Sequence, residues 1–180
     1  EIRNLAIYGY GIKGFVLSMI ECALVLSNYR LPQEVIGKIV AIGKEMLEKP
    51  VALLSGVEEV LQNLQGKYKL VVATKGDLLD QERKLEKSNL LKYFHHIEVM
   101  SDKKEKDYLK LLKHLDIAPS QLLMIGNSLK SDVLPLLEIG ATAIHIPFDT
   151  TWSHEEVSLE ALQKLDYDTL RNIKELIALF

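Results

Sequence analysis

The sequence LLMIGNSLKSDVLP, residues 122–135, runs from a compact apolar stretch through a polar turn into an apolar helical pattern. The run 121–126 predicts a short buried strand that ends at Gly126. Asn127 follows at once, and Asp132 begins the next predicted helix. Ligands of open α/β sheets bind beyond the carboxyl ends of strands, and Asn and Asp oxygens suit a hard cation. The stretch is therefore a candidate cation site, with turn and N-cap chemistry as the alternative interpretation.

The surrounding sequence alternates between strand-like and helical patterns. The β-like runs are 69–74, 95–100, 121–126 and 141–147, and the helical patterns between and after them are 77–89, 106–115 and 130–140. This alternation predicts an α/β fold, a Rossmann-like parallel sheet with helices on both faces. Ser55-x-x-Glu58 has the spacing of a capping box and predicts another helix, and a last helix is expected from about Asp168 to the end.

Residues 1–50 lack this alternation. Apolar positions recur there at helical spacing from Phe15 and again from Pro32, a residue suited to a first helical turn. We therefore expect a small all-helical unit over 1–50 and an α/β core over 51–180.

The composition restricts the classes of function. A net charge of −3 over 180 residues predicts no basic face for nucleic acid. The most apolar stretch, 15–26, is shorter than the ~18 residues of a membrane span and contains Glu21, so no membrane partner is expected. The one cysteine, Cys22, cannot form an intrachain disulfide, which indicates a reducing compartment and a cytoplasmic protein.

A glycine motif near the start, Gly9-x-Gly11-x-x-Gly14, has the spacing of a dinucleotide-binding turn. That turn needs a strand before it and a second strand with an acidic residue about 20 residues later. The segment before Gly9 is a poor buried strand, and the second strand is missing. An NAD-binding oxidoreductase is therefore a weak alternative, and the glycines are better explained as a close junction of two helices.

Two more predicted strand ends carry polar groups. Thr74 ends the run 69–74, where a hydroxyl and the backbone N–H groups entering a helix suit an anion, although such a threonine is commonly only a cap. Lys103 and Lys104 precede the helix expected near Glu105, where a lysine could neutralise a phosphate.

Together, Thr74, Lys103 and the Asn127/Asp132 pair resemble motifs II, III and IV of the haloacid dehalogenase-like (HAD) hydrolase superfamily. The resemblance covers about residues 51–147, and residues 1–50 resemble the helical cap that the family inserts between motifs I and II. It implies a magnesium-dependent phosphatase that acts on a small phosphate monoester through an aspartyl-phosphate. Dehalogenase and phosphonatase chemistry, which also occur in the superfamily, are not separated by these motifs.

The resemblance also implies roles for individual residues. Thr74 and Lys75 would bind the phosphate, and Lys103 would neutralise the phosphate and the nucleophile, with Lys104 as the alternative if the register is shifted by one. Asp132, helped by Asn127, would hold Mg²⁺. Tyr10 or Lys13 of the cap would contact the substrate.

Two departures from the family pattern stand out. Asn127 occupies a position where an aspartate is common, so it brings no charge. The motif I Asp-x-Asp, which supplies the nucleophile, is absent: Asp166-x-Asp168 is C-terminal and is better explained as a cap of the last helix. We expect the nucleophile in a segment N-terminal to this sequence, and we expect the 180-residue chain by itself to be inactive. The alternative is a non-catalytic HAD-like binding protein.

The absent motif predicts a feature of the sheet. In the family the motif I strand lies between the strands of motifs II and IV, here 69–74 and 121–126. Unpaired buried backbone groups are costly, so these two runs should flank a third strand rather than bond to each other. They are expected about 10 Å apart, which is two strand spacings.

Overall fold

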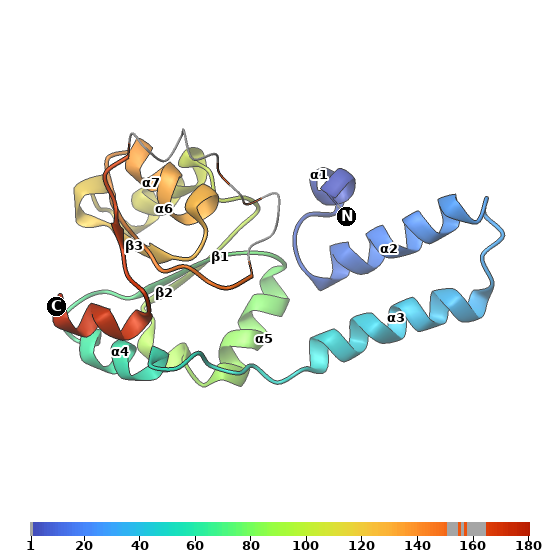
Figure 1. Ribbon diagram of the computed structural model, residues 1–180, viewed down its shortest axis with the longest axis horizontal. Helices are drawn as coiled ribbons and strands as arrows, with labels where there is room; N and C mark the ends of the chain where they lie inside the picture. The colour runs from blue at the N-terminus through green and yellow to red at the C-terminus, as the bar shows by residue number, and fades with distance from the viewer. Residues whose placement is uncertain (1, 151–154, 156, 158–164) are drawn as a thin grey trace. The chain divides into compact units, whose positions relative to one another are not determined.

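A computed structural model describes residues 2–150, 155, 157 and 165–180 of the chain (Figure 1). Its helices are α1 (Leu5–Tyr8), α2 (Ile12–Leu26), α3 (Gln33–Glu48), α4 (Val57–Leu64), α5 (Leu78–Ser88), α6 (Glu105–Leu115) and α7 (Leu134–Glu138). Its strands are β1 (Val71–Lys75), β2 (His96–Met100), β3 (Leu123–Gly126), β4 (Thr142–His145) and β5 (Asp168–Thr169). Short 3₁₀ helices lie at Ile2–Asn4, Leu91–Tyr93, Pro119–Gln121 and Ile173–Ala178, and a π-helix lies at Leu129–Val133.

The chain forms two compact units. The first combines Glu1–Leu53 with Val71–Ser101, and the second combines Leu54–Leu70 with Asp102–Phe180. The first unit holds both the helical segment and the strands β1 and β2. The division into a helical cap and an α/β core at residue 50 stays a prediction. None of the described helices is long and apolar enough to cross a membrane.

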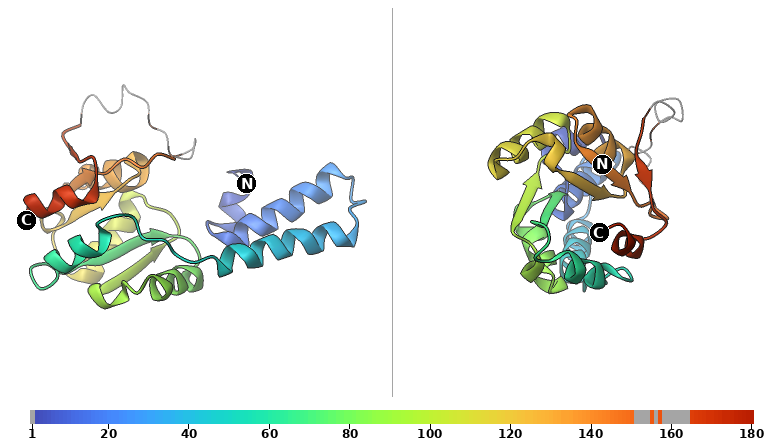
Figure 2. Two further views of the ribbon diagram at one scale, coloured as in Figure 1. Left: turned by 60° about the horizontal axis from the view of Figure 1, so that its bottom comes forward. Right: turned by 90° about the vertical axis from the view of Figure 1, so that its left-hand side faces the viewer.

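In the first unit, α2 and α3 form an antiparallel hairpin whose helices lie side by side in both Figure 1 and Figure 2. Gly43 of α3 lies so close to α2 that an added Cβ would be 2.5 Å from Cγ2 of Val16. Pro32 is the N-cap of α3, one residue before the first helical turn to which its sequence position assigned it. The described part of residues 1–50 contains helices and no strand, so the prediction of an all-helical segment is confirmed.

The glycine motif lies at the junction of α1 and α2. The segment before Gly9 is helical, so the strand that a dinucleotide-binding turn needs does not form there. A Cβ on Gly14 would lie 2.7 Å from the carbonyl oxygen of Gly9 and 2.8 Å from that of Tyr8. The glycine allows the two helices to meet closely, which confirms the packing interpretation.

The strands β1 and β2 of this unit are parallel, in a register that runs from Val71 opposite His96 to Lys75 opposite Met100. The chain then enters α5 through Asp77, whose side chain accepts a hydrogen bond from the Asp80 amide at 3.2 Å. This N-cap satisfies one of the unpaired amides at the helix start.

The second unit contains a parallel sheet in the order β3–β4–β5. A buried apolar cluster covers it, formed by Val60 and Leu64 of α4, Ile144 of β4 and Leu176 of the C-terminal 3₁₀ helix. Helix α4 and this 3₁₀ helix lie side by side (Figure 1). The parallel strands and flanking helices confirm the predicted α/β class.

The prediction of a helix from Asp168 to the end is wrong. Asp168 and Thr169 instead form β5, which pairs with β4, and the Leu170 amide donates to the carbonyl of His145 at 2.9 Å. The 3₁₀ helix starts only after Asn172, whose side chain accepts from the Lys174 amide. The local sequence favours a helix, but pairing with a distant strand satisfies the same backbone groups. Asp166-x-Asp168 is therefore not a helix cap.

Two further local expectations are corrected. The capping box at Ser55 and Glu58 does not form, because the N-cap of α4 is Gly56, which has φ 86° and makes no side-chain cap. The predicted helix 130–140 is also divided, into the π-helix Leu129–Val133 and the short α7.

Within the described residues β1 pairs with β2 alone, and β3 pairs with β4 alone. The runs 69–74 and 121–126 lie in different units of the chain, so the third strand expected between them stays a prediction. Each of β1 and β3 has one edge without a ladder partner among these residues. Their separation by about 10 Å stays a prediction.

We predict that Leu176→Ala lowers the free energy of unfolding by about 2–5 kcal/mol, because the side chain is only 1% exposed and its loss leaves a cavity beside Val60 and Ile144. Urea unfolding measures this change. The control Leu179→Ala removes a side chain that is 54% exposed and should change stability by less than about 0.5 kcal/mol. Equal losses in both variants would contradict the assigned core.

Candidate active site

The candidate site lies in the second unit, at the carboxyl end of β3. Gly126 is the last residue of this strand, and the buried side chain of Asp132 rests directly on its backbone. An added Cβ on Gly126 would overlap the Cβ, Cγ and Oδ2 atoms of Asp132. The glycine therefore creates the space in which this carboxylate lies.

Both carboxylate oxygens of Asp132 have partners. Lys103 Nζ lies 2.6 Å from Oδ1, and the Ser128 amide donates to Oδ2 at 3.0 Å. The side chains of Lys103 and Asp132 are only 10% and 7% exposed. Removing one partner of a buried ion pair costs about 3–5 kcal/mol because the other charge is left uncompensated, so each of these residues depends on the other.

The two lysines ahead of α6 have different surroundings. The Lys103 amide donates to Asp102 Oδ1 at 2.9 Å, and its side chain reaches Asp132. Lys104 is 62% exposed at its side chain and pairs with Asp102 Oδ2 at 2.9 Å. The structure thus brings Lys103, and not Lys104, to the carboxylate.

The π-helical turn that carries Asp132 is held by a buried tyrosine. Pro135 has no N–H and cannot donate to the carbonyl of Ser131, four residues before it. The hydroxyl of Tyr108 on α6 donates to this carbonyl at 2.8 Å. Burial, with a smaller contribution from the nearby Asp132 charge, raises the pKa of Tyr108 above its ordinary value, so the hydroxyl keeps its proton.

A serine pair connects the same turn to Glu155. The Ser128 hydroxyl accepts from the Ser131 amide at 3.0 Å, and the Ser131 hydroxyl donates to Glu155 Oε2 at 2.6 Å. The Ser128 hydroxyl contacts the same oxygen of Glu155. Charge-assisted hydrogen bonds of this kind are stronger than neutral ones, so Glu155 helps to order the turn.

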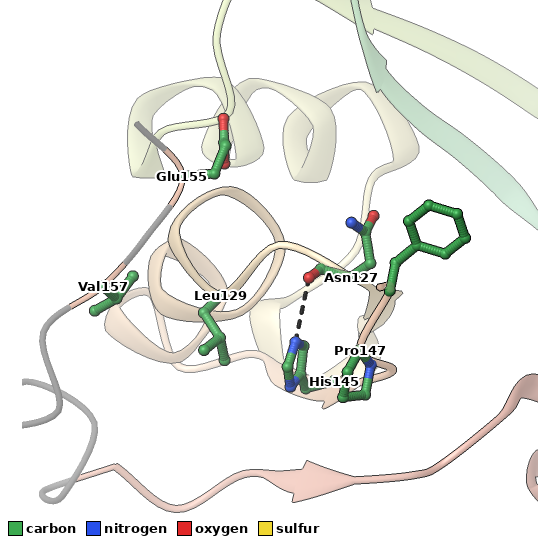
Figure 3. A pocket seen from close by; sticks show the side chains of 7 residues that line it. Asn127, Leu129, His145, Pro147, Glu155 and Val157 are labelled. Carbon is green, nitrogen blue, oxygen red and sulfur yellow. Dashed lines mark hydrogen bonds between the residues drawn. The ribbon is translucent and has the colours of Figure 1, made fainter. Parts of the chain in front are cut away.

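A cavity of about 340 Å³ adjoins Asn127 (Figure 3). Its polar wall contains Asn127, His145 and Glu155, and its apolar wall includes Pro147 and Phe148. A hydrogen bond of 3.2 Å joins His145 Nε2 to the Asn127 carbonyl, drawn as a dashed line in Figure 3. The cavity therefore lies at the carboxyl ends of two neighbouring strands, where parallel sheets bind ligands.

The sequence interpretation did not include His145 in the site. The observation that assigns His145 to the site is the register of the sheet. It places His145 at the end of β4, directly opposite Gly126 at the end of β3. This signal depends on knowing which strands are neighbours, and residue spacing alone does not show that.

Thr74 and Lys75 lie in the first unit. Two acceptors lie at long distance from the Thr74 hydroxyl, Gln81 Oε1 at 3.3 Å and the Lys75 carbonyl at 3.4 Å, and its single proton can be donated to either. Lys75 Nζ lies 4.4 Å from the ring centroid of Tyr10, and Lys13 Nζ lies 2.8 Å from Asp77 Oδ1. The structure thus brings Tyr10 and Lys13 to the loop that follows β1.

The oxygen atoms at the end of β3 are of the kind that Mg²⁺ prefers. Asp132 supplies a carboxylate and Asn127 an amide oxygen, and the space above Gly126 keeps the carboxylate at the strand end. Among the residues that the structure describes, no group of three or more His, Cys, Asp or Glu side chains could hold a metal ion. The donor types suit Mg²⁺, and Asp132 and Asn127 are the residues that would hold it.

We predict that Gly126→Ala displaces Asp132 and separates it from Lys103, because the added methyl group overlaps the carboxylate. The expected loss is about 1–3 kcal/mol, typical of an overpacked site, and thermal unfolding measures it. Gly37→Ala is the matched control: nothing lies within 4 Å of a Cβ on this α3 residue, so the helix should gain up to about 1 kcal/mol. If both variants behaved alike, the close contact at Gly126 would be wrong.

Comparisons with solved structures show which proteins share this fold. A haloacid dehalogenase-like family hydrolase from Xanthomonas campestris is 44% identical, with a TM-score of 0.77 over 83% of this chain, and the match spans 64% of that structure's length. A HAD phosphatase from Thermococcus onnurineus is 20% identical, with a TM-score of 0.60 over 91% of this chain and 77% of its own. A magnesium-bound HAD hydrolase from Bacillus subtilis is 16% identical, with a TM-score of 0.61 over 93% of this chain and 82% of its own.

The last two similarities show the fold alone. No curated protein matches the chain. The family model for haloacid dehalogenase-like hydrolases, however, matches residues 17–144, which include Thr74, Lys103, Asn127 and Asp132. The chain therefore belongs to the haloacid dehalogenase-like hydrolase family.

Proposed function

We propose that this protein is a magnesium-dependent phosphatase that hydrolyses a small phosphate monoester. The observation that carries the proposal is the buried ion pair between Lys103 and Asp132 at the carboxyl end of β3, next to Asn127. A buried lysine beside a carboxylate suits a site that receives further negative charge, such as a phosphate. The phosphatase name of the Thermococcus structure and the magnesium bound to the Bacillus structure support this choice.

Each residue has a role in the proposed reaction. The Thr74 hydroxyl donates its proton to a phosphoryl oxygen instead of to Gln81 Oε1 or the Lys75 carbonyl, both at long distance, and Lys75 adds positive charge to the same loop. Lys103 neutralises charge on the phosphate and the nucleophile. Asp132 and Asn127 would hold Mg²⁺, which offsets the charge of the phosphoryl group.

The nucleophile in this proposal is an aspartate outside the 180-residue sequence. Its carboxylate attacks phosphorus, and the P–O bond to the substrate alcohol breaks as the other aspartate of the Asp-x-Asp motif, acting as general acid, gives its proton to the alcohol oxygen. Water then hydrolyses the aspartyl-phosphate and releases phosphate. In this proposal the helical segment 1–50 is the substrate-selecting cap that the resemblance implies, and the prediction that Tyr10 or Lys13 contacts the substrate belongs to the same proposal. The single cysteine agrees with a cytoplasmic protein.

A second candidate, a non-catalytic binding protein, is favoured by Asn127. An amide at this position supplies an oxygen but no negative charge, which weakens a cation site relative to an aspartate. Binding of inorganic phosphate without turnover, in a protein that does carry an Asp-x-Asp segment, would favour this candidate over the phosphatase.

We predict that the 180-residue chain alone does not hydrolyse p-nitrophenyl phosphate above background in the presence of Mg²⁺, because the sequence contains no Asp-x-Asp ahead of its first helices. Release of p-nitrophenol measures the rate. The control is a longer version of the protein with an N-terminal Asp-x-Asp segment, which should be active. Metal-dependent turnover by the short chain would contradict the proposed origin of the nucleophile.

In that longer version, Asp132→Ala and Lys103→Ala should each remove most activity, on the order of a hundredfold or more, because each leaves a buried charge unpaired. Lys104→Ala should change the rate less than about threefold, because Lys104 is 62% exposed and its ion pair with Asp102 lies at the surface. Steady-state kinetics with p-nitrophenyl phosphate separates these cases. The reverse order of the two lysines would show that the motif III register is wrong.

A further inference from the structure

The glycine-rich turn Tyr8–Gly14 contacts the loop after β1 through an ion pair. Lys13 Nζ lies 2.8 Å from Asp77 Oδ1, between residues 64 positions apart in the sequence. The same carboxylate oxygen accepts the Asp80 amide as the N-cap of α5. The hydrogen bond from Lys13 holds the pKa of Asp77 below its ordinary value, so the carboxylate stays ionised near neutral pH.

A second contact joins the same two segments. Lys75 Nζ lies 4.4 Å from the ring centroid of Tyr10, within the range of a cation–π interaction. Gly11 lies between Tyr10 and Lys13 at φ 109°, and a Cβ there would be 3.2 Å from the Asp77 amide nitrogen. A side chain at this position would be strained by its backbone conformation and crowded by the loop. The turn therefore fits closely against residues 75–77.

A third contact lies at the other end of α5. Lys87, in its last turn, donates from Nζ to the carbonyl of Leu47 near the end of α3 at 2.8 Å. Lysine at a helix C-terminus also complements the helix dipole. Helix α5 is thus connected to the helical segment at both ends.

We propose that the turn Tyr8–Gly14 is a positioning element for the β1–α5 loop, in which Lys13 acts through Asp77, and Tyr10 through Lys75, on the neighbouring Thr74. The consequence for catalysis depends on the phosphatase proposed above. The contacts of Lys13 with Asp77 and of Lys75 with Tyr10 do not depend on that function. They hold Lys75 and Asp77 on the two sides of Gly76 in the loop that follows Thr74, whose hydroxyl has acceptors among the described residues only at the long distances of 3.3 and 3.4 Å.

The effect of losing either contact on the loop depends on how far the contacting side chains are exposed to solvent. Lys13 and Asp77 are 52% and 31% exposed at their side chains, and an exposed ion pair changes an equilibrium by about fivefold at most. A partly exposed cation–π contact has a similar weight. Loss of either contact should therefore change the opening equilibrium of the loop by about three- to fivefold, and not unfold the protein.

Hydrogen exchange of the 180-residue chain tests the contacts without any activity. The amides of Asp80 and Gln81, which donate to the side chain and carbonyl of Asp77, report on the start of α5. Lys13→Met and Tyr10→Leu should each speed their exchange by about three- to fivefold. Unchanged exchange in both variants would overturn the proposal.

Two conservative variants separate positioning from general damage. Tyr10→Phe keeps the ring that Lys75 contacts and should exchange like the natural chain, whereas a loss equal to that of Tyr10→Leu would overturn the role of the ring. Lys174→Met is the matched control for the ion pair. Lys174 is 51% exposed and pairs with Glu59 at 3.3 Å in the other unit, so its loss should leave Asp80 and Gln81 unchanged.

A double-mutant cycle tests whether Lys13 acts through Asp77. Asp77→Asn removes the charge but keeps an N-cap residue of nearly equal rank. If the pair acts as a unit, Lys13→Met in the Asp77→Asn background should add less than about 1.5-fold to the exchange rate. Additive effects of the two substitutions would overturn the coupling.

The catalytic consequence has its own readout. In a phosphatase-active version of the protein, Lys13→Met and Asp77→Asn should each raise KM for p-nitrophenyl phosphate by about three- to fivefold with little change in kcat, and the double variant should raise it no further, since Lys13 acts on Thr74 through Asp77. A rise in KM with Lys13→Met but not with Asp77→Asn would overturn this link and would favour direct contact of Lys13 with the substrate. Faster exchange with an unchanged KM would overturn the link to Thr74 while the phosphatase stands. Faster exchange in a protein with no phosphatase activity would overturn the proposed function and support the positioning contacts.

Discussion

The structure of the candidate site depends on Gly126, a residue without a side chain at the end of β3. Asp132 rests on the backbone of Gly126 in a space that a single Cβ would fill. From this place its carboxylate accepts the Ser128 amide and pairs with Lys103. A glycine at a strand end therefore determines where the buried negative charge lies, and the buried charge in turn determines where the lysine can be neutralised.

The turn around Asp132 and the lysine that pairs with it are both connected to α6. Lys103 precedes this helix, and Tyr108, fully buried in its first turn, donates to the carbonyl of Ser131. Pro135 makes that carbonyl available because it has no amide hydrogen to donate. One helix thus fixes the cation and the backbone around its partner, which limits how far the ion pair can move apart.

The sequence predicted features that depend on short spacings and missed features that depend on distant partners. Strand and helix periodicity located β1, β3 and α2 because burial of one face is a local pattern. The last helix was wrong because Asp168 and Thr169 pair with β4, which lies more than 20 residues earlier in the chain. Lys103 and Asp132 were predicted as site residues, whereas the contact of Lys13 with Asp77 joins residues 64 apart that no local pattern connects.

The role of a glycine motif depends on the helix or strand that precedes it. Gly14 brings two helices together, Gly11 admits the loop after β1, and Gly126 admits a carboxylate. In each case the glycine provides only a close approach to the backbone, and the neighbouring element decides what approaches. A strand before Gly9 would have made a dinucleotide turn plausible, but the helix α1 leaves its glycines a packing role. Residues 122–135 were the better guide to the family because a strand, a glycine and an acidic residue occur there in the order of its motif IV.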